Sequence, residues 1–169
     1  MTTITVRRAA RDDAPHLLAL IDALADYERL DRPDAPARGR LVADGFERHP
    51  PRFEAYLAEQ GGTPVGYAIV FETYSSFLAR PTLYIEDLFV LPDARCHGAG
   101  SALFRRLAEE ALARDCGRME WVVLDWNALA QDFYRRRGGK HLEDWQYYRL
   151  TRDELLRLAA NETTETEAR

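Results

Sequence analysis

The sequence predicts an α/β protein built on one mixed β-sheet with helices on both of its faces. Three apolar runs of strand length lie close together at residues 53–58, 64–73 and 82–91, and the short segments between them favour an antiparallel meander. A helical pattern at residues 100–114 then leads to another apolar run at 119–124, which is the order of a strand–helix–strand crossover. Antiparallel strands followed by a crossover predict a mixed sheet.

The segment before the meander predicts one strand and two helices. Residues 3–8 alternate like a first strand. An aspartate pair and a proline precede an amphipathic helix expected over residues 14–27. Two prolines in residues 28–37 indicate a loop, which should lead to a short helix near residues 38–46.

The C-terminal part predicts a helix, a strand and a last helix. A helical pattern covers residues 127–137 and is closed by a glycine pair. Residues 147–150 have the composition of a final strand, and Thr151 is placed to cap the last helix. The threonine-rich tail, residues 161–169, is acidic and is expected to be disordered.

Length and composition predict a single domain over residues 1–160. A chain of 169 residues with 46% hydrophobic content can bury one sizeable core. No apolar run is long enough to span a bilayer and the N-terminus lacks the apolar segment of a signal peptide, so we expect a soluble, cytoplasmic protein with no membrane partner. Cys96 and Cys116 have no ligand-like spacing and should be reduced thiols.

The net charge and the placement of the histidines argue against binding of nucleic acid and of a metal ion. The net charge of −5 disfavours binding of nucleic acid and mildly favours a cationic partner. The four histidines are scattered singly through the chain, so no metal site is expected.

The junction between residues 83–91 and the helix after it has the geometry of an anion site. The apolar strand ends at Pro92, and Gly98 and Gly100 then open the helix. Without a Cβ atom at the glycines, backbone N–H groups can approach a phosphate at the helix N-terminus. A tight strand-to-helix turn is the alternative explanation of the two glycines. The segment is neither a P-loop nor a dinucleotide fingerprint, because the Gly-Lys-Ser/Thr sequence and the third glycine are absent.

Residues 95–100, Arg-Cys-His-Gly-Ala-Gly, fit the pattern R-x-x-G-x-G and resemble the acetyl-CoA loop of the GNAT superfamily of N-acyltransferases. Within that superfamily, residues 84–90, 125–127 and 133–138 resemble the spermidine/spermine and thialysine N-acetyltransferase branch. The likeness extends over nearly the whole chain and implies the GNAT fold. One departure is Cys96, where that branch usually has glycine or a basic residue.

The resemblance implies acetyl-CoA as cosubstrate and no metal. The strand holding Glu86 and the strand holding Trp121 should splay apart, with the pantetheine arm between them. The residues expected to contact the cosubstrate are Leu88, Phe89, Val90, Arg95, Cys96, His97, Gly98, Ala99, Gly100, Ser101 and Asn127. Two of these have alternatives: Arg95 as a solvated surface arginine, and Asn127 as the N-cap of its own helix, which is compatible with a pantetheine contact.

Two residues are candidates for the chemistry. The resemblance implies that Tyr134 is the general acid for the CoA sulfur, and a phenol can stay protonated at neutral pH. A core aromatic is the alternative. Glu86 and Asp87 interrupt an apolar strand, so one of them should face the core or a cavity unless the strand is irregular. We prefer Glu86, which matches the substrate side of the family, as a proton acceptor through water or a cation anchor; a structural ion pair is the alternative.

Tyr27 and Glu28 match a family pair at the polyamine channel, where the carboxylate would bind a second ammonium group. The sequence therefore predicts an N-acetyltransferase that acts on a primary amine of a small cationic molecule, such as a polyamine, a diamine or a lysine-like compound. Two rivals stay open: another acceptor, namely an amino acid, an aminoglycoside-like amine or a protein N-terminus, and a non-catalytic acyl-CoA-binding regulatory module. The resemblance also implies a homodimer, with the C-terminal strand and helix contributing to the interface.

Overall fold

The structure, a computed structural model, describes residues 3–160. It contains one five-stranded sheet in the order β1-β2-β3-β4-β5, in which the first three pairings are antiparallel and β4 and β5 are parallel. The strands are β1 (Ile4–Arg8), β2 (Glu54–Gln60), β3 (Thr63–Ser75), β4 (Arg80–Val90) and β5 (Arg118–Trp121). The predicted mixed sheet is confirmed.

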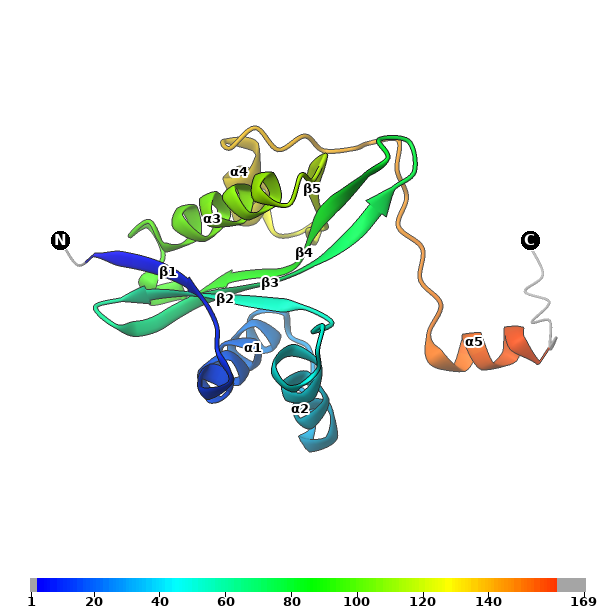
Figure 1. Ribbon diagram of the computed structural model, residues 1–169, viewed down its shortest axis with the longest axis horizontal. Coiled ribbons are helices and arrows are strands. Elements are labelled where there is room, and N and C mark those ends of the chain that lie inside the picture. The colour runs from blue at the N-terminus through cyan, green and yellow to red at the C-terminus, as the bar shows by residue number, and fades with distance from the viewer. Residues whose placement is uncertain (1–2, 161–169) are drawn as a thin grey trace. The chain divides into compact units, whose positions relative to one another are not determined.

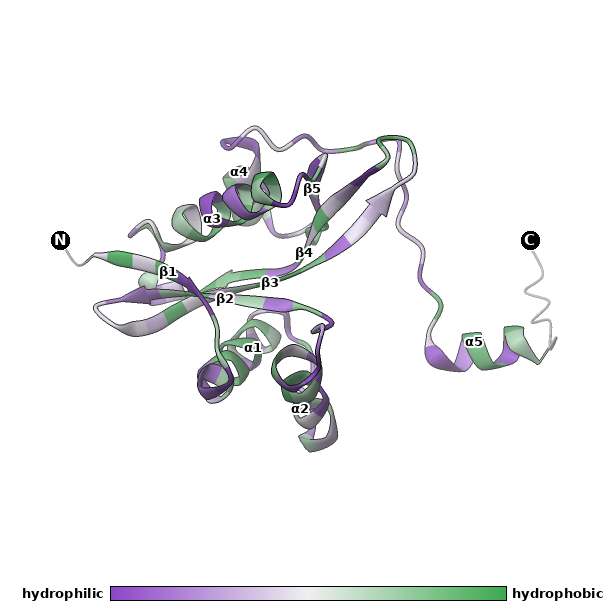
Figure 2. Ribbon diagram, viewed as in Figure 1, coloured by the Kyte–Doolittle hydropathy of each residue, from purple (hydrophilic) through white to green (hydrophobic). Residues whose placement is uncertain are grey.

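Helices cover both faces of this sheet, as predicted (Figure 1). On one face lie α1 (Ala14–Glu28) and α2 (Ala35–Val42), which continues into a π-helical turn at Ala43–Glu47; α3 (Ala99–Ala113) lies on the other. Hydrophobic and hydrophilic residues occur together along α1 and α3, as an amphipathic helix requires (Figure 2).

Each helix layer has its own apolar core. Leu103 and Leu107 of α3 are fully buried with Leu83 of β4 in one cluster. On the opposite face, Leu17 of α1 is buried with Phe89 of β4 in the second cluster. Strand β4 therefore supplies side chains to both cores, and this anchors the strand that leads into the glycine-containing loop.

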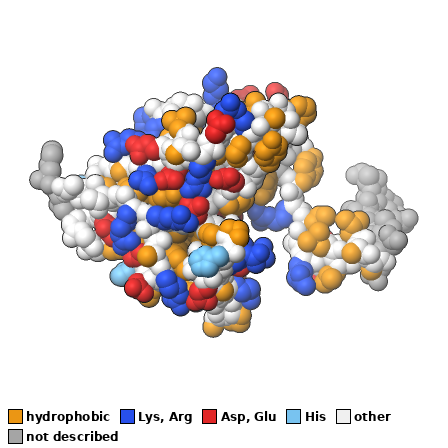
Figure 3. Space-filling view, in the orientation of Figure 1, with side chains coloured by type: hydrophobic (Ala, Val, Ile, Leu, Met, Phe, Trp, Pro, Cys, Tyr) orange, Lys and Arg blue, Asp and Glu red, His pale blue; other side chains and the backbone are white. Residues whose placement is uncertain are grey.

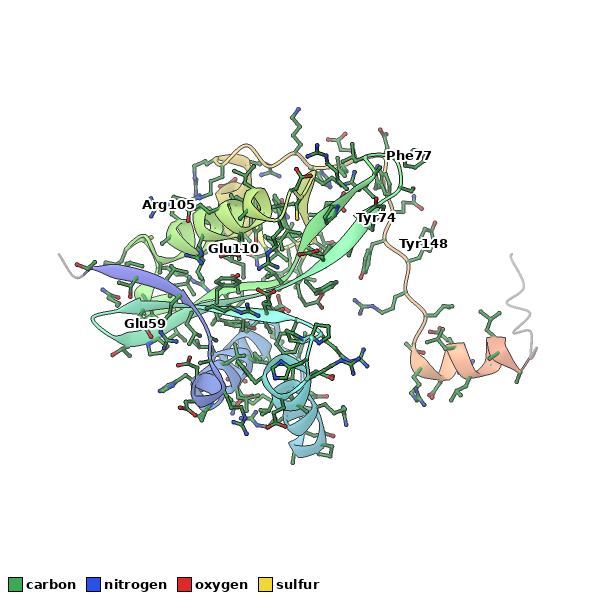
Figure 4. The ribbon with its side chains drawn as sticks, in the orientation of Figure 1. Glu59, Tyr74, Phe77, Arg105, Glu110 and Tyr148 are labelled. Atoms are coloured by element: carbon green, nitrogen blue, oxygen red, sulfur yellow. The ribbon has the colours of Figure 1, made fainter. Side chains whose placement is uncertain are left out.

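Charged side chains of both signs mix over the face shown in Figure 3, and one group of them ties α3 to the sheet. Arg114, just past the end of α3, contacts Glu54 of β2 at 2.6 Å and Glu110 at 3.0 Å. Glu110 lies on α3 and is labelled in Figure 4. The network fixes the C-terminal end of the helix whose N-terminal end meets the loop.

Within the described part of the chain, residues 123–160 belong to a second compact unit. This unit contains α4 (Ala128–Arg135) and α5 (Arg152–Ala159). The predicted cap of the last helix is confirmed, because the Thr151 hydroxyl accepts from Glu154 N–H while the Glu154 carboxylate accepts from Thr151 N–H. The predicted disordered tail lies outside the described residues.

Two expectations about secondary structure are wrong. Residues 147–150 form no strand, because Tyr147, Tyr148 and Leu150 are exposed and no neighbouring strand in the described part of the chain pairs with them. Helix α2 begins at Ala35 rather than near residue 38, because its second residue is a proline, which the first helical turn accepts, and the Asp34 side chain caps Ala37 N–H at 2.8 Å.

Candidate active site

The loop between β4 and α3 begins with a single 3-10 turn at Pro92–Ala94 and ends in a left-handed residue. Gly98 has a φ of +95° and precedes the first helical residue, and no side chain caps this helix start. The first hydrogen bond within the helix runs from Ala102 N–H to Gly98 O at 2.9 Å. The N–H groups of Ala99 and Gly100 therefore belong to the first turn, where a helix has no acceptors of its own to offer.

The space next to Gly98 is open. A Cβ atom built on this glycine would have no heavy atom within 4 Å, and Gly98 itself is exposed. Ala99, the next residue, is buried and anchors the helix start to the core. An exposed helix N-terminus with open space beside a residue of positive φ is a geometry that can accept a phosphate, and the phosphate site stays a prediction.

Cys96, at the position where the resembled branch usually has glycine or a basic residue, has a φ of +64°. This left-handed conformation costs a residue with a side chain about 1 kcal/mol or more. His97 beside Cys96 is exposed.

Arg95 does not extend into solvent. Its Nε donates to Val90 O at 3.0 Å, and its guanidinium carbon lies 4.6 Å from the ring centroid of Tyr27 and 5.7 Å from that of Phe89. The side chain is half-buried. It thus connects the loop to the last turn of α1 and to the end of β4.

The β4 edge that faces β5 is only partly paired. The ladder between these two strands ends at the pair Ile85–Trp121, whereas β4 continues to Val90 and pairs with β3 over that stretch. Leu88, Phe89 and Val90 therefore have a strand partner on one side. This is the arrangement that a sheet-like contact with pantetheine amides needs.

A β-bulge lies at Glu86. Across the β3–β4 ladder Ile69 pairs with Asp87 and Val70 pairs with Ile85, so Glu86 is the extra residue with no cross-strand partner. Its side chain is exposed. The sequence left open whether the strand is regular at its two adjacent carboxylates. The structure shows that it is irregular there, because the extra residue of the bulge is Glu86, the first of the two.

The bulge reverses which face the following residues take. Ile85 before it packs in the α3-side core, whereas Phe89, four residues later, packs in the α1-side core. Asp87 shares the α1 face with Phe89, because the Tyr67 hydroxyl, which belongs to that core, donates to the Asp87 carboxylate at 3.1 Å. The more buried of the two carboxylates is thus Asp87, while Glu86 is exposed.

A third carboxylate, that of Glu28, lies close enough to Asp87 for their negative charges to interact. Glu28 is the last residue of α1 and is half-buried, and burial raises its pKa above the ordinary value. Burial also raises the pKa of Asp87, to about 6; the hydrogen bond from Tyr67 opposes this rise, and the negative charges of Glu86 and Glu28 add to it. Three carboxylates therefore lie within electrostatic range at the end of α1 and the β4 bulge. We refer to Glu28, Glu86 and Asp87 as the acidic cluster.

The raised pKa of Asp87 predicts a pH dependence of stability. The folded protein holds this proton more tightly than the unfolded chain, whose aspartate titrates near 3.8. The unfolded chain therefore binds fewer protons between about pH 4 and 6, and the free energy of unfolding should fall by roughly 1–3 kcal/mol as the pH rises through that window. Asp87→Asn should remove this fall because the amide oxygen still accepts from Tyr67 without titrating.

Urea unfolding of the parent and Asp87→Asn at pH 4 and pH 7 measures the effect. The control is Glu86→Gln, an exposed neighbour on the same strand, which should keep most of the parent's pH dependence. An Asp87→Asn protein with the same pH dependence as the parent would contradict the assignment.

Two predicted site residues lie in the second unit. Asn127 caps α4, since its Oδ1 accepts from Ala130 N–H at 3.1 Å, as one of the two expected roles requires. Tyr134 lies on α4, and burial raises the pKa of its phenol to about 12. The phenol therefore carries its proton at neutral pH, as a general acid must.

The sequence did not identify Tyr67 as a site residue, and it favoured Glu86 over Asp87 as the functional carboxylate. In the sequence, Tyr67 has the pattern of a core aromatic within an apolar run, and only the bulge directs Asp87 toward it.

Within residues 3–160, no group of three or more His, Cys, Asp or Glu side chains is arranged to hold a metal ion. No helix in the same range is long and apolar enough to cross a membrane.

The fold and the loop define an acyltransferase class, and comparison with known proteins agrees. Residues 17–139 match the Acetyltransferase (GNAT) family. The chain therefore belongs to the GNAT acetyltransferase family and is an acetyl-CoA-dependent N-acetyltransferase.

Similar proteins cover most of the chain. A thialysine N-epsilon-acetyltransferase of Sus scrofa is 34% identical over 170 residues, covering 94% of this chain and 99% of the relative. A spermidine/spermine N(1)-acetyltransferase-like protein of Homo sapiens is 33% identical over 96% of this chain and 24% of its own length. An integron cassette protein of V. cholerae has the same fold, with a TM-score of 0.78 at 22% identity over 94% of this chain and 99% of its own.

Proposed function

We propose that this enzyme transfers acetyl from acetyl-CoA to a primary amine of a small cationic molecule that carries a second amine. The acceptor class comprises polyamines, diamines and lysine-like compounds. The observation that carries the proposal is the acidic cluster, in which burial or neighbouring negative charge raises the pKa of Glu28 and Asp87. Like charges held together favour occupation by cations, because a cation relieves their mutual repulsion.

The names of relatives support a diamino acceptor. Besides the thialysine and spermidine/spermine enzymes, an L-ornithine N5-acetyltransferase of Arabidopsis thaliana is 40% identical over 90 residues, or 53% of this chain. Thialysine, ornithine and the polyamines share two amino groups separated by a short chain. Two separated amines suit a site with two separated carboxylates.

We assign the proton transfers to Glu86 and Tyr134. As the acceptor nitrogen bonds to the acetyl carbonyl carbon and the carbon–sulfur bond breaks, the amine loses a proton and the departing sulfur gains one. Glu86, exposed at the bulge, would take the amine proton through water, and Tyr134 would donate to the sulfur. A phenol whose pKa is about 12 retains the proton it must deliver. The substitution of Tyr134 treated in the Discussion tests this assignment.

The acceptor class is tested by thiol release from acetyl-CoA with purified protein and a panel of amines. The panel contains 1,4-diaminobutane, spermidine, lysine, a monoamine of matched length, an aminoglycoside and an N-terminal peptide. We expect the largest kcat/KM with the diamines or the lysine-like acceptor. Preference for the monoamine, aminoglycoside or peptide would overturn the acceptor assignment, and absence of turnover with every amine would favour a binding module.

We also propose a homodimer. Trp145, Tyr147 and Tyr148 are each at least 70% exposed in an extended segment, and Tyr148 is labelled in Figure 4. Aromatic side chains are enriched at protein–protein interfaces, and a second copy is the partner that the family resemblance implies. Light scattering at micromolar concentration should give twice the 19.4 kDa mass of the chain. A monomer mass would contradict the proposal.

The proposed compartment is the cytoplasm. Cys96 and Cys116 are both free thiols, which suits a reducing environment. Cell fractionation should find the protein in the cytoplasmic fraction, and recovery from an oxidising compartment would contradict the assignment.

A further inference from the structure

The side chain of Arg95 lies apart from the loop that carries its backbone. Its backbone belongs to the proposed phosphate loop, with Arg95 N–H bonded to Pro92 O at 3.2 Å. Its guanidinium instead lies against the ring of Tyr27, the next-to-last residue of α1, with 4.6 Å between the guanidinium carbon and the ring centroid. One side chain therefore spans the cosubstrate side and the acceptor side of the proposed site.

The guanidinium is held from several directions. Nε donates to Val90 O at 3.0 Å, and the ring centroid of Phe89 lies 5.7 Å from the guanidinium carbon. The Tyr27 and Phe89 rings also contact each other, with centroids 6.1 Å apart. A planar cation over aromatic faces is favourable, and a planar guanidinium with a fixed N–H direction holds such a position better than a flexible ammonium.

Tyr27 leads directly to the acidic cluster. Glu28 follows it as the last residue of α1, and Arg29 then ends the helix in the left-handed conformation, with a φ of 59°. The direction of the Glu28 carboxylate thus depends on the last turn of α1, which the Tyr27 ring fixes against Phe89 and Arg95. The Tyr27 ring is therefore a physical link between the loop residue Arg95 and the helix end that carries Glu28.

We propose that Arg95 is a positioning residue that couples binding of the cosubstrate to binding of the amine. Occupation of the loop by the cosubstrate phosphates holds the loop backbone, and Arg95 then holds Tyr27 and the end of α1 in the geometry that binds the second ammonium group. Linkage requires that the amine tighten cosubstrate binding by the same factor. The inference rests on the proposed function, since it needs Glu28 to contact the acceptor.

Calorimetric titration with CoA and 1,4-diaminobutane tests the coupling without turnover, because CoA carries no acetyl group. In the parent, saturating CoA should lower the diamine Kd about fivefold or more, which is the lower end of typical coupling factors. In Arg95→Met the ratio of the diamine Kd without CoA to the diamine Kd with saturating CoA should fall to about 1, as expected when the coupling contact is absent. A purely structural role would instead lower the melting temperature and weaken both ligands while leaving the ratio unchanged.

One further pair of variants and a control variant sharpen the test. Tyr27→Leu should lose the coupling, whereas Tyr27→Phe, which keeps the ring, should retain it; this pair decides the question if Arg95→Met does not fold. Arg106→Met is the matched control, because Arg106 lies over the Tyr56 ring at 5.8 Å on α3, away from the loop, and should leave the ratio as in the parent.

The outcomes separate this inference from the proposed function. A coupling ratio that survives in folded Arg95→Met or Tyr27→Leu, or a parent with no coupling, overturns the role of Arg95 while diamine acetylation stands. A parent that neither binds nor acetylates the diamine overturns both.

Discussion

Tyr134→Phe should lower kcat by roughly 10²-fold or more, because loss of a general acid removes a proton transfer made in the transition state. The affinity for acetyl-CoA and the melting temperature should change little, since phenylalanine keeps the buried ring. The measurement is steady-state kinetics across pH, with a separate determination of the acetyl-CoA Kd.

The control for this substitution is Tyr74→Phe, which removes the same hydroxyl from an exposed tyrosine near the tip of the β3–β4 hairpin, labelled in Figure 4. It should retain parental kcat. If Tyr134→Phe stays within about threefold of the parent at every pH, where loss of a general acid should cost far more, Tyr134 is a core aromatic and the sulfur departs without it.

The second large effect concerns the phosphate loop. Saturating acetyl-CoA should raise the melting temperature of the parent by several degrees, because a ligand that binds only the folded state stabilises it. Gly98→Val should abolish this rise, since its side chain would enter the open space beside the first N–H groups of α3. The substitution also places a β-branched residue at a φ of +95°, so some loss of stability is expected whatever the ligand does.

Gly62→Val separates the two effects. Gly62 has a φ of +82° and, like Gly98, open space within 4 Å of a built Cβ, but it lies in the β2–β3 turn. Both valine variants should lose stability to a similar extent, and only Gly98→Val should lose the response to acetyl-CoA. A folded Gly98→Val protein with the parental response would remove this loop from the cosubstrate site.

The sequence predicts the order of the elements well because the information is local. The meander follows from apolar runs of strand length, and the junction of β4 with α3 follows from a proline and two glycines at the right spacing. The same kind of local evidence misleads at residues 147–150, where two tyrosines and a leucine indicate a strand but cannot show whether a partner strand is present. A strand exists only through its ladder.

The site is less predictable because its geometry depends on register and side-chain direction. The bulge at Glu86 inserts one residue into β4; the adjacent carboxylates leave an irregular strand open, but the sequence does not show whether the pairing with β3 shifts there. That shift directs Asp87 toward Tyr67 and the α1 face. Likewise, a loop arginine such as Arg95 can point to solvent, to a phosphate or to an aromatic ring, and only the packing of α1 against β4 provides the ring.

If the acceptor is a diamine, its second ammonium group should bind Glu28. Glu28 is half-buried, so its contact with the ammonium group should be charge-assisted and only partly screened by water. Such a contact contributes about 1.5–3 kcal/mol to binding. Glu28→Gln should therefore lower kcat/KM for the diamine by roughly 10- to 150-fold. A monoamine of matched length has no such contact and should change little.

The most direct test is the ratio of kcat/KM for the diamine to that for the monoamine, measured in the parent, in Glu28→Gln and in Asp26→Asn. Asp26 is the matched control, because it is an exposed carboxylate two residues earlier on α1 that pairs with Arg32. We expect a high ratio in the parent and in Asp26→Asn and a ratio near 1 in Glu28→Gln. Equal losses for both substrates in Glu28→Gln, or no diamine preference in the parent, would contradict this expectation and leave Glu28 as a helix-end charge without a role in acceptor choice.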